Sequence, residues 1–431
     1  MRPRALAALW LCATAAGLVL VYAGWSIRSP VLMDWRPWPV VALCALALAL
    51  AAAAWRAARG AGRALRLLAA APGLLALAAG LWREGGARWL EHSVMAAPSA
   101  ELRAVARHLI VGFDSFANLD PLVVRAGVAG IFVARHNVRN LDAEALAREI
   151  GRLQGLRRAA GLPPLRVATE QEGGPASALS PPLPPPAALS TLSHAGELVI
   201  NATQNTARDL ACAGINVNFA PVVDVSRRAN GPGDPATQIS RRAISSDERV
   251  VAGTARDYCR VLADSGVQCT LKHFPGVGAV KGDTRLDKAS LPELLDMDLY
   301  PFREITSEDE PWIMLGHVSI DALEDGLPAS ASPRLIGVLR DDWGFSGVLV
   351  TDDVSMAAYA LDFERNIVAT MSGGADLVFV SRDPDLIYET LDILLRERRN
   401  NPVFAEALSK SDARLARAPP GEPACRRLAA R

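Results

Sequence analysis

Residues 347–352, GVLVTD, form a short run of aliphatic and β-branched residues that ends on an aspartate. Such a run is typical of a buried parallel strand, and a carboxylate at its end indicates that something there uses the charge. Similar runs recur along the chain from about residue 100. The predicted strands are 109–113, 130–135, 165–170, 216–221, 268–274, 312–317, 347–352 and 375–381.

Longer stretches with apolar residues at helical spacing lie between most of these strands. Alternation of strands and helices predicts parallel strands joined by crossover helices. Eight such units between residues 100 and 415 fit an α/β fold of the (β/α)₈ TIM-barrel type, whose active site lies at the C-terminal ends of the strands. A doubly wound open sheet gives a similar pattern and remains the alternative. The predicted helices are 143–159, 195–213, 246–265, 331–343 and 355–372.

Polar residues gather at the ends of the predicted strands. Any one of them could be a helix cap or a satisfied core group. Six at the same rim are better explained by a functional site. They are Glu170, Asp224, Lys272, His273, His317 and Asp352.

The N-terminal fifth of the chain has a different composition, rich in Ala, Leu, Val and Trp. It contains three apolar runs, Ala5–Trp25, Trp38–Trp55 and Leu67–Trp82, of which the first two carry no charge. Because about 20 apolar residues can cross a bilayer as a helix, we expect residues 1–90 to be a membrane anchor with two or three transmembrane helices. The third run is the weakest because it contains Pro72. A cleavable signal peptide is the alternative for the first run.

The arginines of residues 56–66 predict how this anchor is oriented. The segment RAARGAGRALR holds four arginines and no acid, and positive loops stay in the cytoplasm. We therefore expect a multi-pass protein of the cytoplasmic membrane with its barrel on the extracytoplasmic side. The side inverts if the third run does not span. Residues 416–431 are expected to form a short basic tail.

Charge and cysteine usage exclude several classes of protein. The formal net charge is zero and the predicted barrel has no basic stripe, so nucleic acid is not an expected partner. The six cysteines show neither a CxxC motif nor metal-ligand spacing, and they define no disulfide framework or redox compartment. No metal or other cofactor is expected.

Four segments carry a family resemblance, in the expected order along the chain. The sequence resembles glycoside hydrolase family 3, in particular its single-barrel β-N-acetylglucosaminidases (β-N-acetylhexosaminidases), from about Leu109 to Pro384. The segments are AGINVNFAPVVDV (213–225), KHFPG (272–276), GHVSIDALEDGLPASASP (316–333) and VLRDDWGFSGVLVTDDVSM (338–356).

The resemblance implies a role for individual residues. Asp352 matches the family's nucleophile, and Lys272 and His273 match residues that contact sugar hydroxyls. Arg242 matches the arginine of the glycan site, although the adjacent Arg241 leaves the register open, and a surface pair with Asp247 is the alternative. The implied partner is an amino-sugar glycan, including peptidoglycan fragments.

The catalytic loop departs from the family pattern. Retaining hydrolysis needs a second group that protonates the leaving oxygen, and this branch uses a loop histidine supported by an aspartate, in a pattern like KHFPGHGxxxxDSH. Here Asp283 matches the aspartate, but Arg285 stands at the histidine position and Val277 replaces an earlier histidine. Sliding the register to Asp287 places Ala289 there instead. Arginine stays protonated and cannot transfer a proton near neutral pH.

Two further departures lie in the segment TEQEGGP. Glu170 stands where the family usually has a sugar-binding aspartate, and Pro175 stands where an arginine commonly follows the glycines. The longer Glu170 side chain is expected to shift a hydroxyl contact or admit a different sugar.

These departures leave two hypotheses open. The first is a β-N-acetylhexosaminidase-type hydrolase with weakened or altered acid–base chemistry, in which Asp283, Asp287 or Glu293 is a candidate substitute acid. The second is a catalytically silent, membrane-anchored glycan-binding or scaffold protein. Retention of Asp352 favours the enzyme, and loss of the histidine favours the binder.

Overall fold

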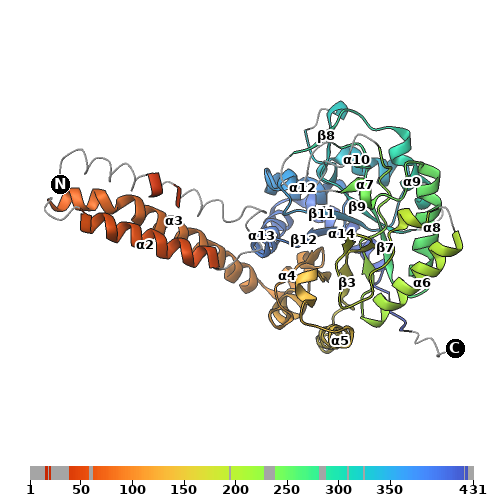
Figure 1. Ribbon diagram of the computed structural model, residues 1–431, viewed down its shortest axis with the longest axis horizontal. Coiled ribbons are helices and arrows are strands. Elements are labelled where there is room, and N and C mark those ends of the chain that lie inside the picture. Colours follow the sequence, from red (N-terminus) through yellow and green to blue (C-terminus); the bar gives the residue numbers. More distant parts are fainter. Residues whose placement is uncertain are drawn as a thin grey trace. The chain divides into compact units, whose positions relative to one another are not determined.

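The protein divides into two compact units, Met1–Ala96 and Ala97–Arg431, drawn in Figure 1. Each unit is described by itself. The computed structural model describes residues 15–17, 19–20, 38–57, 62–193, 196–227, 238–280, 288–307, 310–323, 326–421 and 423–425.

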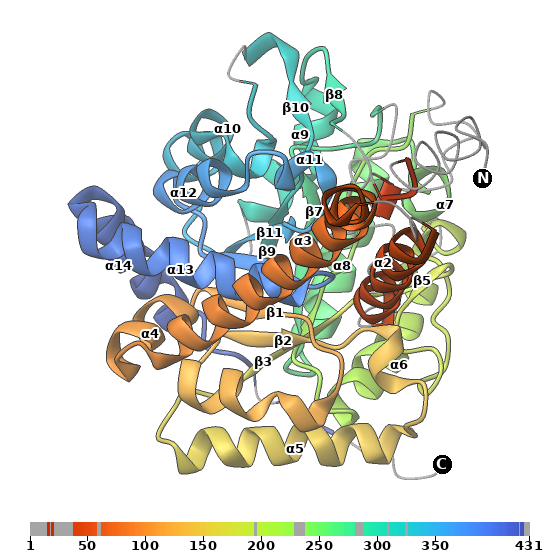
Figure 2. The same ribbon diagram turned by 90° about the vertical axis from the view of Figure 1, so that its left-hand side faces the viewer.

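The predicted barrel is present in the second unit. Eight parallel strands pair in the closed order β1-β12-β11-β9-β7-β6-β3-β2, and β2 pairs with β1 to complete the ring. Figure 2 shows β1, β2 and β3 side by side. A closed ring excludes the doubly wound open sheet. The strands are β1 Leu109–Val111, β2 Gly130–Phe132, β3 Arg166–Thr169, β6 Val217–Asn218, β7 Gln268–Phe274, β9 Trp312–Leu315, β11 Leu349–Asp353 and β12 Leu377–Val380.

Helices follow the strands and form the outer layer of the barrel unit. Helix α5 coincides with the predicted range 143–159, and Asp142 caps it by accepting from the Ala145 N–H. The helices are α4 Ser99–Ala106, α5 Ala143–Ala159, α6 Gly196–Cys212, α7 Ile239–Arg242, α8 Glu248–Ala263, α9 Asp296–Thr306, α10 Pro333–Gly337, α11 Ala357–Ala360, α12 Phe363–Gly373, α13 Pro384–Asn400 and α14 Pro402–Arg417. Two small sheets, β4 Gln171–Gly173 with β5 Ala176–Ser177 and β8 Ser290–Leu291 with β10 Ser319–Ile320, lie outside the ring.

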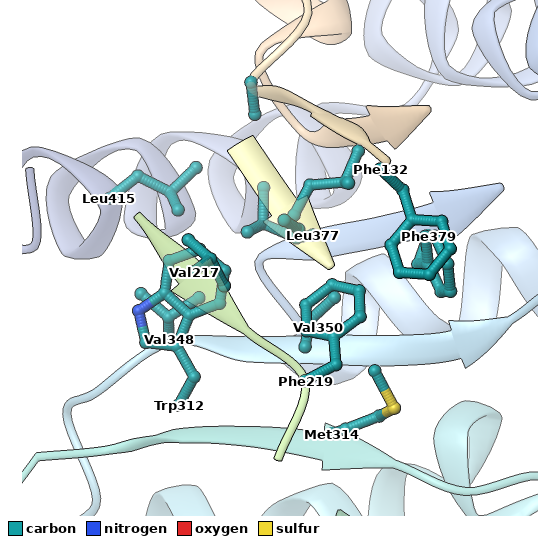
Figure 3. Packing of buried hydrophobic residues seen from close by; sticks show 13 residues of the cluster. Phe132, Val217, Phe219, Trp312, Met314, Val348, Val350, Leu377, Phe379 and Leu415 are labelled. Atoms are coloured by element: carbon teal, nitrogen blue, oxygen red, sulfur yellow. The ribbon is translucent and has the colours of Figure 1, made fainter. Parts of the chain in front are cut away.

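Aliphatic and aromatic side chains fill the barrel interior (Figure 3). The rings of Phe132 and Phe219 stack with centroids 5.7 Å apart, and Phe379 meets both edge-on at 4.8 and 5.1 Å. These three rings come from the C-terminal ends of β2, β6 and β12. The barrel is therefore a packed core with no channel through it, and the polar residues lie at its rim.

The C-terminal segment crosses the opposite end of the barrel. Arg166, the first residue of β3, donates to the carbonyls of Leu415 and Ala418, and Asn216 donates to that of Gly421. A disulfide between Cys212 and Cys425 holds the segment to the end of α6.

A second disulfide joins Cys259 on α8 to Cys269 on β7. The sequence interpretation that the cysteines define no disulfide framework was therefore wrong. Their spacing gave no sign of the pairing, because the partners are 213 and 10 residues apart.

In the described part of the first unit, helices α2 Trp38–Ala57 and α3 Arg63–Ala96 lie side by side (Figure 1). They approach closely at Gly73, where an added Cβ would lie 2.6 Å from the Ala47 carbonyl oxygen. The buried side chains of Ala47 and Ala51 lie at this contact.

The expected membrane-spanning region is wrong for this unit. Within the described ranges, the structure contains no helix that is long and apolar enough to cross a membrane. The third apolar run is only part of the 34-residue helix α3, which continues through Arg83, Glu84 and Arg88. The run Ala5–Trp25 lies largely outside the described residues. The expectation of a multi-pass protein of the cytoplasmic membrane, with the barrel placed by three crossings, is corrected with it.

Candidate active site

Asp352 lies near the C-terminal end of β11 and is the predicted nucleophile. Its Oδ1 accepts the backbone N–H of Asp353 at 2.8 Å, and no described residue donates to Oδ2. Burial raises the pKa of Asp352, but the charges that His273 and His317 carry when protonated, with the Asp353 N–H, outweigh it and hold this pKa below its usual value. Asp352 is therefore an anion at neutral pH, and one of its oxygens has no donor among the described residues.

Asp353 holds the end of β11 in place. Its carboxylate accepts from the N–H and hydroxyl of Ser355 at 3.1 and 2.7 Å, and from the N–H and hydroxyl of Ser381 at 3.1 and 2.5 Å. Ser381 follows β12, the neighbouring strand. Because successive side chains of a strand point to opposite faces, Asp353 can tie β11 to β12 while Asp352 faces the other way.

His317 supports the same strand end from β9. Its Nε2 lies 3.1 Å from the backbone oxygen of Asp353, and its Nδ1 lies 2.7 Å from the Ser330 hydroxyl. A carbonyl oxygen only accepts, so Nε2 carries the proton and Nδ1 accepts from Ser330. Burial lowers the pKa of His317 even though the Asp352 charge opposes it. His317 is thus a neutral imidazole with both nitrogens in use.

His273 follows Lys272 on β7 and is held by Asp224. The His273 Nδ1 lies 2.7 Å from Oδ2 of Asp224, which is fully buried. The other Asp224 oxygen accepts the backbone N–H groups of His273 and Val277 at 3.1 and 2.8 Å. Three N–H donors therefore fix this carboxylate, which in turn fixes the orientation of the imidazole.

Four charged residues form an ionic cluster beside the histidine: Glu170, Glu172, Arg242 and Lys272. The Lys272 Nζ lies 2.5 Å from Oε1 of Glu170 and 2.5 Å from Oε1 of Glu172. Arg242 binds both Glu172 oxygens, at 2.6 and 2.8 Å, and its Nη2 lies 3.5 Å from Oε1 of Glu170. Two positive and two negative charges cancel within the ionic cluster.

The pKa shifts show that the buried members of this cluster stay charged. Burial raises the pKa of Glu172, but the charges of Arg242 and Lys272 outweigh it and hold this pKa far below its usual range. Burial lowers the pKa of Lys272, but Glu170 and Glu172 outweigh it and raise this pKa. The Glu170 side chain is 38% exposed against 1% for Lys272, so Glu170 is the member most accessible from solvent.

Glycines bring the β7 loop close to its neighbours. An added Cβ on Gly278 would lie 1.8 Å from the Val225 carbonyl oxygen, and one on Gly316 would lie 3.2 Å from the His273 Cβ. Only glycine allows the first approach. Among the described residues, no group of three or more His, Cys, Asp or Glu is arranged to hold a metal ion.

Comparison with known proteins identifies the family. Residues 101–417 match the model of the glycosyl hydrolase family 3 N-terminal domain. The chain belongs to glycosyl hydrolase family 3. It is a glycoside hydrolase whose Asp352, ionic cluster and histidines lie where this fold places its active site.

Several relatives of this family 3 enzyme are named as hexosaminidases. The chain is 31% identical over 343 residues to β-hexosaminidase LpqI of Mycobacterium tuberculosis, covering 75% of this chain and 84% of that protein. It is 32% identical over 311 residues to a β-hexosaminidase of Xanthomonas campestris pv. campestris, covering 68% and 89%. The crystal structure of β-N-acetylhexosaminidase from Beutenbergia cavernae superposes with a TM-score of 0.68 at 25% identity, over 75% of this chain and 99% of that one.

The structure brings most of the sequence-predicted site residues of this family 3 barrel together. Glu170, Arg242 and Lys272 lie in the ionic cluster, His273 is adjacent to Lys272, and the charge of His273 acts on Asp352. Asp283, Arg285 and Asp287 lie outside the described residues.

The register of the two arginines is now defined. Arg242 points into the ionic cluster, whereas Arg241 is exposed. Asp247, the alternative partner for Arg242, instead caps α8 by accepting from the N–H groups of Arg249 and Val250.

Sequence reasoning missed two residues, Glu172 and Asp353. Glu172 lies two positions after Glu170, and in an extended segment residues two apart face the same side, so the spacing itself was a signal. Asp353 was not expected to take part, because it is adjacent to Asp352 and successive side chains of a strand point to opposite faces.

Proposed function

We propose that this glycoside hydrolase is a retaining β-N-acetylhexosaminidase-type enzyme that acts on amino-sugar glycans, including peptidoglycan fragments, with Asp352 as its nucleophile. The observation that carries the proposal is the state of Asp352, an anion at the end of β11 with one oxygen free of described partners. Relatives named β-hexosaminidase support the substrate class.

The reaction proceeds in two steps. An Asp352 oxygen attacks the anomeric carbon while the bond to the leaving oxygen breaks, and a proton goes to that oxygen. Water then attacks the same carbon, loses a proton and releases the Asp352 carboxylate. Two inversions retain the configuration of the anomeric carbon.

The ionic cluster supplies the sugar-binding groups. The Glu170 carboxylate accepts from sugar hydroxyls. Its Oε1 is held by the Lys272 Nζ at 2.5 Å and by the Arg242 Nη2 at 3.5 Å. Fixed donors and acceptors that converge on one place give orientation and specificity to a small ligand. The Glu170 side chain is longer than the usual aspartate, so the sugar it favours differs in the position of one hydroxyl contact.

The acid–base position distinguishes this protein from its branch of the family. With Arg285 at the histidine position, proton transfer from the loop is lost, which typically lowers the rate by ~10²–10⁴ when nothing replaces it. Activated aryl glycosides need little protonation and remain good substrates, whereas natural disaccharides are turned over more slowly.

The test is hydrolysis of nitrophenyl N-acetyl-β-glucosaminide followed by proton NMR of the first product. We expect the β-anomer to form first. An α-anomer would contradict retention. If no amino-sugar glycoside is cleaved while N-acetylglucosamine or a muropeptide still binds in calorimetry, the second candidate, a silent glycan binder, is correct. The loss of the loop histidine is the observation that favours that candidate.

A further inference from the structure

The loss of the loop histidine leaves the reaction without an obvious proton carrier, so another group must exchange a proton at the leaving oxygen. The described site holds other carboxylates and histidines besides the nucleophile. With Glu172 of the ionic cluster these make six: Glu170, Glu172, Asp224, His273, His317 and Asp353.

Five of the six already bond to other groups of the protein. Asp224 and Asp353 accept from N–H and hydroxyl donors. Glu170 and Glu172 each lie 2.5 Å from the Lys272 ammonium. His317 uses both ring nitrogens, with Nε2–H on the Asp353 carbonyl and Nδ1 on Ser330.

His273 is different because only one of its nitrogens bonds to a residue that the structure describes. Its Nδ1–H donates to Asp224, and no described residue hydrogen-bonds to Nε2. The side chain keeps 11% of its surface exposed, so a ligand or water can reach it. A carboxylate on one nitrogen, with the second nitrogen left for the substrate, is the arrangement by which enzymes hold a general acid–base.

The ring is also held in a fixed place. Asp224 accepts the His273 backbone N–H as well as the ring N–H. Gly316, the residue after β9, packs against the ring's base, because a Cβ added to it would lie 3.2 Å from the His273 Cβ. A general acid must lie at a fixed position relative to the leaving oxygen, and a packed strand end is more rigid than a loop.

Two carboxylates act on the His273 ring. The Asp224 carboxylate contacts the ring, and Asp352 is close enough that the two groups act on each other. The charge of the adjacent Lys272 is balanced within the ionic cluster, and His317 is neutral. The charges that remain around the ring are therefore those of two carboxylates.

We propose that His273, oriented by Asp224, is the general acid–base of this enzyme in place of the missing loop histidine. This inference rests on the proposed function. In the first step the Nε2–H gives its proton to the leaving oxygen as Asp352 bonds to the anomeric carbon, which leaves a neutral imidazole. In the second step Nε2 takes a proton from the attacking water, and Asp352 leaves as a carboxylate. The sum is hydrolysis of one glycosidic bond by one water.

The experiment compares leaving groups in His273→Gln. We expect kcat/KM for a disaccharide of N-acetylglucosamine to fall by ~10²–10⁴, as for removal of a general acid–base. The first-turnover release of nitrophenolate from the aryl glycoside should change by less than about tenfold, because that anion leaves without a proton. Steady turnover of the aryl glycoside should slow, and azide should restore it by forming a glycosyl azide, because azide needs no base.

Three further variants keep the result interpretable. Asp224→Asn should show the same pattern as His273→Gln, since it removes the acceptor that fixes the ring tautomer. Lys272→Met should lower both substrates together and gain nothing from azide. His92→Gln, outside the barrel unit, should change nothing. Thermal unfolding of each variant confirms that it is folded.

The outcomes separate this inference from the proposed function. If wild type forms a covalent adduct on Asp352 but His273→Gln lowers all substrates equally and azide has no effect, His273 only contacts the sugar and the inference is wrong. If Glu170→Gln shows the leaving-group dependence and azide rescue instead, Glu170 is the acid–base. If wild type forms no adduct with any amino-sugar glycoside, the proposed function itself fails.

Discussion

The barrel rim contains two groups of charged residues that differ in how far the protein itself satisfies them. In the ionic cluster every charge has an opposite partner within 3.5 Å, and the sum is zero. Asp352 and His273, here called the reactive pair, each keep one atom without a partner among the described residues. In the proposed mechanism, the charges that the protein satisfies orient the sugar, and the incompletely bonded Asp352 and His273 carry out the bond cleavage.

The largest loss of activity is expected when the proposed nucleophile is removed. Asp352→Asn keeps the shape of the side chain but loses the attacking anion, so turnover should fall by more than ~10⁴-fold. Hydrolysis of the nitrophenyl glycoside measures the loss. Asp341→Asn, an exposed aspartate of the same signature segment, is the matched control and should leave activity unchanged. Residual turnover within tenfold of wild type would show that another group attacks.

Removing a charge from the ionic cluster should mainly lower the free energy of unfolding. Glu172→Gln leaves Arg242 and Lys272 short of one buried counter-charge, and breaking a buried pair typically destabilises by about 3–5 kcal/mol. Urea unfolding measures the change. Glu293→Gln, at an exposed position, should stay within about 0.5 kcal/mol of wild type. A loss below about 1 kcal/mol for Glu172→Gln would mean that the cluster contributes little.

The same cluster predicts a pH dependence of stability. Because the pKa of Glu172 is lowered in the folded protein, its contribution is fully present above the unfolded value of about 4.3 and is lost as pH falls through the folded value. The stability difference between wild type and Glu172→Gln should be constant near neutral pH and shrink below about pH 4. A difference that grows on acidification would give the wrong sign and contradict the assignment.

Restoring the family's loop histidine tests whether proton transfer limits the rate. Arg285→His adds a second proton carrier at the expected position, so disaccharide turnover should rise, by up to ~10²-fold if proton transfer limits the rate. Aryl glycoside turnover should rise less. No change in either substrate would show that the loop residue does not reach the leaving oxygen.

The smallest effect is expected for ligand affinity. Lys272→Met removes the cation that fixes Glu170, and amino-sugar affinity should weaken by about 1 kcal/mol, as for one hydrogen bond to a charged group. Calorimetry with N-acetylglucosamine measures it. Unchanged affinity would place the sugar away from the ionic cluster.

The barrel could be predicted from the sequence because a parallel strand buried on both faces reads as an uninterrupted apolar run. Residues 268–274 were expected as a strand and form β7 with those bounds. Short strands were harder to delimit: of the predicted strand 216–221, only Val217–Asn218 is a strand in the structure.

The contacts within the site were harder to predict from the sequence than the barrel. Strand ends predicted which residues reach the rim, but not that Asp224 would pair with His273, because pairing depends on the spatial order of the strands. Apolar composition predicted membrane helices in residues 1–90, where composition alone could not show that α2 packs on α3 or that α3 extends into a charged half. The disulfides were equally invisible, since Cys212 and Cys425 meet only after the barrel closes.

Mass spectrometry of the trapped intermediate tests the central claim most directly. Wild type is mixed with nitrophenyl N-acetyl-β-glucosaminide, quenched in acid and digested. We expect one peptide, containing Asp352, to be heavier by one N-acetylglucosaminyl group, and no such adduct to form in Asp352→Asn. An adduct on any other residue, or none under conditions where nitrophenolate is released in a burst, would contradict it.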